Sequence, residues 1–204
     1  MKEFLIPSMR VNPERFYVPQ IEPRENIEAW VNAEWTPERW RLPESNWCAM
    51  TNVRSYCMSL GKIVPSLEEL YSHATKYLVY RDIDDRIIGA YHASLATFIE
   101  LEFSLVAEAK RNMSAADVAA ALMDDCAVFA SVSPQIRCTD AAPAPKNPSG
   151  HFVFVYGLGL DSVILHNSAG FVSNETQSHV VTPWWKFMEC FSGRAIVVHP
   201  KKQS

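Results

Sequence analysis

Residues 149–168 read SGHFVFVYGLGLDSVILHNS, and this stretch decides the fold. It contains two apolar runs, at 151–157 and 162–167, on either side of a short glycine-rich segment. Apolar runs of this length around such a segment are typical of two antiparallel strands joined as a β-hairpin. The first run is apolar on both of its faces, so we expect other structure to cover the hairpin on both sides.

The turn position sets which side chains meet across this hairpin. A turn centred on Gly159 places His151 directly opposite Asn167. Directly opposed side chains on antiparallel strands have Cβ atoms about 4.5–5.5 Å apart, which is within reach of a side-chain hydrogen bond. A slip of one residue would present His166 instead, facing the other side of the sheet.

In the rest of the chain, the spacing of the apolar residues changes near residue 126. Before this point apolar residues recur every three or four positions, which predicts helices, and after it short apolar runs predict strands. The predicted helices span about 48–60, 66–77, 90–103 and 114–125, and a short helix is predicted from Thr182 to near Gly193. The predicted strands span 127–132, 151–157, 162–167 and 195–199. The Ala/Pro-rich segment 141–148 is predicted to be a loop. This order predicts an α+β fold. We expect a single domain of residues 1–204, with a mainly helical lobe at 1–125 and an antiparallel β lobe at 126–204.

Composition narrows the classes of function. A net charge of −4 provides no basic field for holding phosphates, so we expect no nucleic-acid partner. No apolar stretch is typical of a signal peptide or a membrane span, so we expect a cytoplasmic protein with no membrane partner. The five cysteines are odd in number and widely spaced, as free thiols are in a reducing compartment. The Cys and His spacings fit no metal site, and we expect no cofactor.

Cys48 lies where turn-prone residues give way to a helix. A thiol at a helix N-terminus is biased toward thiolate by the helix dipole and by unpaired backbone N–H groups. Trp47, beside it, is a candidate wall for a substrate groove. Taken singly, a Cys is more often a small buried hydrophobe, and a His or Asn at a strand end is more often satisfied by solvent or a turn. The combination of Cys48, His151 and Asn167 is what predicts a Cys–His–Asn nucleophilic site.

Several segments together resemble a known family. They are Asn46-Trp47-Cys48-Ala49 at the start of the Cys helix, 149–153 and 164–168 around His151 and Asn167, and 185–198 at the last helix and strand. From about residue 46 to 198 the chain resembles the papain-like cysteine peptidases of the bacteriocin-processing type, which cut after double-glycine leaders. The resemblance implies a papain-like fold, in which a helical lobe carrying the Cys helix packs on an antiparallel sheet carrying His and Asn.

The same resemblance assigns roles to the site residues. It implies that Cys48 is the nucleophile, that His151 is the base and then the acid, and that Asn167 orients His151. The sequence departs from the family at Cys48-Ala49-Met50, where Cys-Gly-Pro is usual, and at Leu42, where a Gln donates into the oxyanion hole. Gln20 or Asn46, together with the Cys48 backbone N–H, are the candidates to replace that donor.

These observations favour a cysteine-dependent acyl-transfer enzyme, most simply a peptidase or amidase acting on a peptide or an acyl or amide substrate. An amine acceptor in place of water would make it a transacylase of a peptide or natural-product pathway, which could use a carrier-bound thioester. Two other classes stay open. One is a binding module of the same fold that has lost turnover, and the other is a structural partner using the aromatic segment 28–47, which contains Trp30, Trp35 and Trp40.

Overall fold

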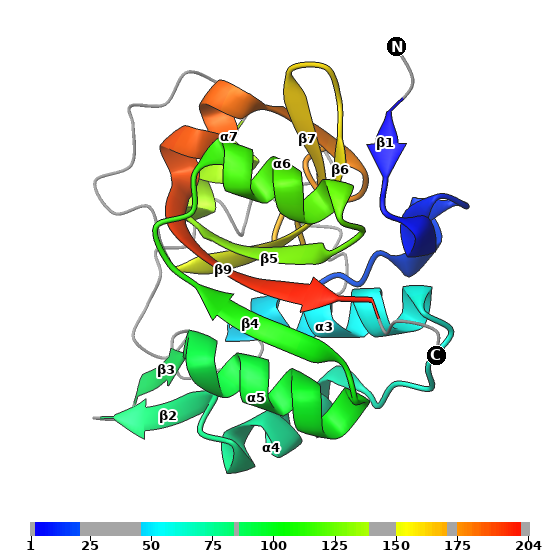
Figure 1. The fold of residues 1–204 in the computed structure, drawn as a ribbon. Coiled ribbons are helices and arrows are strands. Elements are labelled where there is room, and N and C mark those ends of the chain that lie inside the picture. Colours follow the sequence, from blue (N-terminus) through cyan, green and yellow to red (C-terminus); the bar gives the residue numbers. More distant parts are fainter. Residues whose placement is uncertain (1–2, 21–45, 84–85, 139–149, 171–174, 201–204) are drawn as a thin grey trace.

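The computed structural model describes residues 3–20, 46–83, 86–138, 150–170 and 175–200. Within them the chain has an α+β fold in which helices pack against an antiparallel sheet, as predicted (Figure 1). Two expectations lie outside the described residues: the loop at 141–148 and the three Trp residues Trp30, Trp35 and Trp40.

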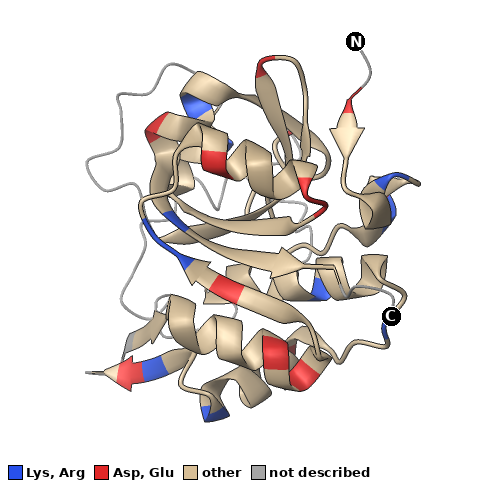
Figure 2. Ribbon diagram, in the orientation of Figure 1, with Lys and Arg blue, Asp and Glu red and all other residues tan. Residues whose placement is uncertain are grey.

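A seven-stranded sheet forms the centre of the molecule. Its strands run in the order β4 (Val106–Lys110), β9 (Phe191–His199), β5 (Ala127–Val132), β6 (His151–Leu158), β7 (Ser162–His166) and β8 (Val180–Pro183), and β1 (Phe4–Leu5) pairs with β6. Every pairing is antiparallel. A separate two-stranded sheet joins β2 (Tyr80–Ile83) and β3 (Arg86–Gly89). The central strands β5, β6 and β7 carry no Asp, Glu, Lys or Arg (Figure 2) and are almost wholly buried, which agrees with a hairpin covered on both sides.

Five α-helices and three short 3₁₀ turns are described around this sheet. They are η1 (Pro7–Met9), η2 (Pro13–Phe16), α3 (Cys48–Ser59), α4 (Leu67–Lys76), α5 (His92–Phe103), α6 (Ala115–Met123), η4 (Pro134–Arg137) and α7 (Trp184–Cys190). The four long helices match their predicted ranges to within about two residues at each end, and β5 matches in full. Strands β1, β2, β3, β4 and β8 were not predicted, and β9 begins four residues earlier than expected.

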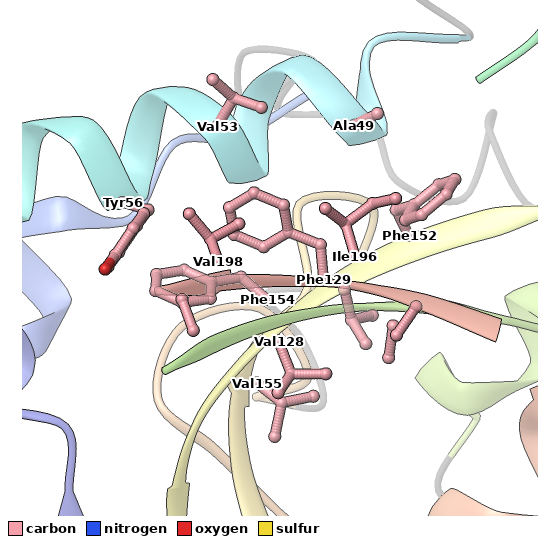
Figure 3. Close-up of a cluster of buried hydrophobic side chains, with 14 of the residues drawn as sticks. Ala49, Val53, Tyr56, Val128, Phe129, Phe152, Phe154, Val155, Ile196 and Val198 are labelled. Carbon is pink, nitrogen blue, oxygen red and sulfur yellow. The ribbon is translucent and has the colours of Figure 1, made fainter. Parts of the chain in front are cut away.

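The Cys helix α3 packs directly on the sheet. Figure 3 shows Tyr56 of this helix directed toward aromatic side chains of β5 and β6. The Tyr56 ring meets Phe129 at 6.1 Å and Phe154 at 5.7 Å between centroids, both edge to face. All of these side chains are fully buried. Because these aromatic contacts are fixed by close packing, they hold α3 at a set position on the sheet.

The hairpin register differs from the prediction. Phe154 pairs with His166, so Asn167 is not directly opposite His151 as a turn centred on Gly159 requires. The turn is instead closed by a hydrogen bond from the Gly159 N–H to the Ser162 carbonyl at 2.9 Å. The centre of the turn therefore lies nearer the second strand than predicted, and the pairing has a bulge between Val155 and Gly157. At the Phe154–His166 pair the net shift is two residues, and an even shift keeps Asn167 on the same face of the sheet as His151.

Replacing Ser66 with Ala is expected to lower the free energy of unfolding by about 1 kcal/mol, because Ser66 caps α4. Its Oγ accepts from the Glu69 N–H at 3.2 Å, and Glu69 Oε2 accepts from the Ser66 N–H at 2.9 Å, so the two residues form a capping box. Denaturant unfolding measures the change. Ser72→Ala, on an exposed position of the same helix, is the control, and equal stabilities of the two variants would contradict the capping role.

Candidate active site

Cys48 is the first residue of α3, and its thiol is enclosed. The first helical hydrogen bond runs from the Thr51 N–H to the Trp47 carbonyl, so the Cys48 N–H lies among the donors that a helix leaves unused. Burial raises the pKa of the Cys48 thiol to about 11, and backbone hydrogen bonding by Phe152, Ala49 and Cys48 itself acts in the opposite direction. The sulfur therefore lies against the backbone at the start of β6, where His151 is the preceding residue.

His151 and Asn167 are in direct contact. His151 Nε2 lies 2.8 Å from Asn167 Oδ1, and both side chains are buried. The amide oxygen only accepts, so Nε2 carries the proton and Nδ1 is left as the basic ring nitrogen. The Asn167 segment is itself fixed, because its N–H donates to the Gln177 carbonyl at 2.7 Å. The predicted His–Asn contact is thus present, although it is made diagonally rather than across a direct pair.

Burial also sets the charge state of the imidazole. It lowers the pKa of His151 to about 4; the hydrogen bond with Asn167 raises this pKa, and the Arg137 charge lowers it further. With a thiol pKa near 11 and an imidazole pKa near 4, both groups are neutral at pH 7. Among the described residues the Cys48 thiol makes no hydrogen bond with the His151 ring. At rest the thiol and the imidazole are therefore both neutral, and the two groups do not form a thiolate–imidazolium ion pair.

The remaining predicted site residues lie on two segments near this pair. Gln20 is buried, 7% exposed, and its N–H donates to the Ser168 carbonyl at 3.0 Å, one residue beyond Asn167. Asn46 and Trp47 lead directly into α3 and are half-buried. Within the described part of the chain, Asn46 Nδ2 and Trp47 Nε1 are buried donors without a hydrogen-bond partner. A buried donor left unpaired costs about 1–3 kcal/mol, which favours a ligand oxygen at this position.

Tyr80 is a site neighbour that the sequence did not indicate. Its hydroxyl donates to the Asn46 carbonyl at 3.0 Å, which ties β2 to the residues before Cys48. Burial raises the pKa of the Tyr80 phenol, and the nearby Cys48 adds to that rise. The sequence around Tyr80 contains no pattern that predicts this contact, because the contact depends on how β2 packs against the residues that precede α3.

A thiol–imidazole contact lies at the other end of the sheet. Cys126 Sγ is 3.4 Å from His199 Nδ1, and His199 Nε2 is 3.1 Å from Glu108 Oε1. The chemistry of this cluster differs from that at Cys48, because burial and the acidic residues Asp124, Asp125 and Glu108 all raise the pKa of the Cys126 thiol. Cys126 also follows the C-terminal end of α6, where the helix dipole disfavours a thiolate. The cluster therefore supplies an internal comparison for Cys48 rather than a competing nucleophile.

The described residues contain no group of three or more His, Cys, Asp or Glu side chains placed to hold a metal ion. None of the described helices is both long and apolar enough to cross a bilayer.

Comparison with known proteins defines the fold. No protein-family model and no curated protein matches the chain. A C39-like peptidase structure from Bacillus anthracis superposes on 98% of this chain and 99% of its own, with a TM-score of 0.58 and 12% identity. The double-glycine motif protease of an AMS/PCAT transporter, solved in complex with the leader peptide, covers 76% of this chain and 84% of its own at a TM-score of 0.48 and 16% identity. At 12% identity the first likeness shows the fold, that of a C39-like, papain-like peptidase, with N-terminal helices packed on an antiparallel sheet.

Proposed function

We propose that this protein is a cysteine-dependent acyl-transfer enzyme, of the peptidase or amidase type, in which Cys48, His151 and Asn167 are the catalytic residues. The observation that carries the proposal is the buried 2.8 Å contact between His151 Nε2 and Asn167 Oδ1, together with a Cys48 sulfur that lies against the backbone of Phe152, the residue after His151. The C39-like peptidase fold supports the same reading. The substrate is a peptide or another acyl or amide compound.

The reaction proceeds in two steps. As Cys48 Sγ attacks the carbonyl carbon, His151 Nδ1 takes the thiol proton, and it then gives that proton to the departing amine when the C–N bond breaks. The product is a thioester on Cys48. Water then attacks the thioester carbonyl and gives a proton to His151, the C–S bond breaks, and the proton returns to the sulfur. Asn167 keeps the protonated nitrogen of His151 facing away from the sulfur throughout.

The negative charge that develops on the carbonyl oxygen needs donors placed in advance. The Cys48 N–H at the start of α3 is one donor. The second is a side-chain amide, and the two candidates are Gln20, anchored to Ser168, and Asn46, whose buried Nδ2 has no hydrogen-bond partner in the described residues.

The proposal predicts selective alkylation of Cys48 by iodoacetamide at about pH 5.5. A thiol with no base loses about tenfold in rate for each pH unit below its pKa, whereas Cys48 passes its proton to His151 during the attack. We expect Cys48 to label about tenfold or more faster than Cys126, and peptide mass spectrometry reads each site separately.

Cys126 is the matched control because it is also buried and its sulfur contacts the imidazole of His199. His151→Ala should remove the advantage of Cys48 and leave the labelling of Cys126 unchanged. If Cys48 labels no faster than Cys126 or Cys138, and His151→Ala changes nothing, Cys48 is not the nucleophile.

A catalytically silent binding module is a second candidate, and one observation favours it. The described Cys48 thiol is neutral, enclosed and not hydrogen bonded to His151, so no thiolate is prepared in advance. Such a module would fail the labelling test above.

For an active protein, the acyl acceptor is identified from the acetyl-enzyme formed with p-nitrophenyl acetate. Release of acetate in water indicates a hydrolase, and formation of N-acetylglycinamide on adding glycinamide indicates a transacylase.

A further inference from the structure

We propose that residues 13–20 form a strap that positions the oxyanion side of this site, with His166 and Tyr17 as its positioning residues. The inference rests on the proposed function, because it assigns the strap to the reaction at Cys48. The strap consists of η2 and the four residues that follow it, ending at Gln20.

Three hydrogen bonds tie the strap to three successive residues of the segment that holds Asn167. The His166 ring donates from Nε2 to the Pro13 carbonyl at 3.1 Å, and the Tyr17 hydroxyl donates to the Asn167 carbonyl at 3.4 Å. The Gln20 N–H donates to the Ser168 carbonyl at 3.0 Å. The strap is thus bonded along its whole length, and its last residue is the candidate oxyanion donor.

His166 can hold the strap only in one tautomer, and its surroundings fix that tautomer. Nδ1 accepts from the His179 N–H at 3.2 Å, so the proton is on Nε2 and points to Pro13. Burial keeps the pKa of His166 near 3, so the ring stays neutral at any physiological pH. The ring also packs edge-on against Tyr17, with centroids 5.5 Å apart.

The consecutive residues His166 and Asn167 therefore make their contacts on opposite faces of the sheet. Asn167 faces His151 and orients the base, whereas His166 faces the other way and holds the strap. The strap also contacts the Cys helix, because η2 packs against α3. In Figure 1 this dark-blue segment passes beside α3, and Val18 and Gln20 at its end are buried. One short segment thus links the Cys helix to the Asn167 segment.

The test compares two reactions of Cys48 in the full chain. Acetylation by p-nitrophenyl acetate passes through a tetrahedral oxyanion, and alkylation by iodoacetamide does not. Tyr17→Phe keeps the ring and removes only the hydroxyl, and we expect it to slow acetylation by about three- to tenfold while alkylation stays within about twofold. His166→Phe, which leaves Pro13 without its donor, should slow acetylation by about tenfold or more, and His166→Gln, which restores a donor, should recover most of the rate.

Tyr77→Phe is the matched control, because it removes a Tyr hydroxyl that donates to Glu102 at 2.8 Å between α4 and α5. It should change neither reaction. A strap with only a structural role would change both reactions together or neither, and either result overturns the inference. If His166→Phe does not fold, Tyr17→Phe alone decides. Failure of the proposed function is distinguishable, since Cys48 would then show no His151-dependent reactivity even in the unmodified protein.

Discussion

Replacing His151 with Ala is expected to slow acetylation of Cys48 by p-nitrophenyl acetate by about 10²–10⁴-fold at pH 7. The size of the effect follows from the resting charge state. With a thiol pKa of about 11, roughly one Cys48 in 10⁴ is a thiolate at pH 7 when no base takes its proton. Under the proposed mechanism the neutral His151 of the unmodified protein removes the proton during the attack, so the expected rate does not depend on the small thiolate population.

The pH profile gives a sharper signature than the rate alone. The reactive form has a neutral thiol and a neutral imidazole, so acetylation should be independent of pH between about 5 and 10 and fall below the imidazole pKa of about 4. The direction of the fall follows because a protonated His151 cannot accept the thiol proton. In His151→Ala only the thiolate reacts, so the flat profile should become a tenfold rise per pH unit.

The control for this substitution is His73→Ala. His73 is a half-buried residue of α4 that contacts Glu102 at 3.4 Å, away from Cys48. It should retain the flat profile and the full rate. Thermal unfolding of each variant checks that the fold persists. A His151→Ala protein whose profile stays flat would show that another group takes the Cys48 proton.

Local patterns predicted the elements that depend on local physics. The helices at Ser66 and Ser114 begin with capping boxes, in which neighbouring residues satisfy each other's backbone groups. Strand β5 is apolar at every position except Ser131 and is buried throughout, and a short apolar run of this kind is typical of a buried strand. Strand β4, in contrast, reads Val-Ala-Glu-Ala-Lys, a composition with weak strand propensity, and it forms because β9 provides a long partner edge.

The site shows the same division. The contact of His151 with Asn167 could be predicted from the sequence because both residues lie on one hairpin. The shift in register at these positions is even, so both side chains stay on the same face. The contact of Cys126 with His199 was not found, although it follows from the pairing of Ala127 with Val198, which makes the next residues outward neighbours. Recognising it required knowing that β5 and β9 are adjacent, and strand order is not a local property.

The placement of Gln20 is the least local feature of all. The family resemblance directs attention to the residue about six positions before Cys48, which is Leu42, and an apolar side chain there cannot donate. Gln20 reaches the Asn167 segment through the strap, by contacts that join residues about 150 positions apart in the chain. A long-range arrangement of this kind leaves no spacing signal in the sequence.

Replacing Gln20 with Ala is therefore expected to slow acetylation of Cys48 by about 10²–10³-fold, the loss typical of removing one oxyanion donor. Alkylation by iodoacetamide, which develops no oxyanion, should stay within about threefold of the unmodified rate, so the ratio of the two rates isolates the donor role. The pH profile should stay flat, because the Cys48–His151 proton transfer is untouched.

Asn46→Ala is the competing substitution, since Asn46 Nδ2 is a buried donor without a hydrogen-bond partner in the described residues and lies just before Cys48. If Gln20 is the donor, Asn46→Ala should lower acetylation by less than about tenfold, through the loss of a side chain that packs near the nucleophile. A loss of about 10²–10³-fold in Asn46→Ala with none in Gln20→Ala would move the oxyanion role to Asn46. It would also mean that the strap has no role in catalysis, because the strap is proposed to act on the reaction only by positioning the Gln20 amide.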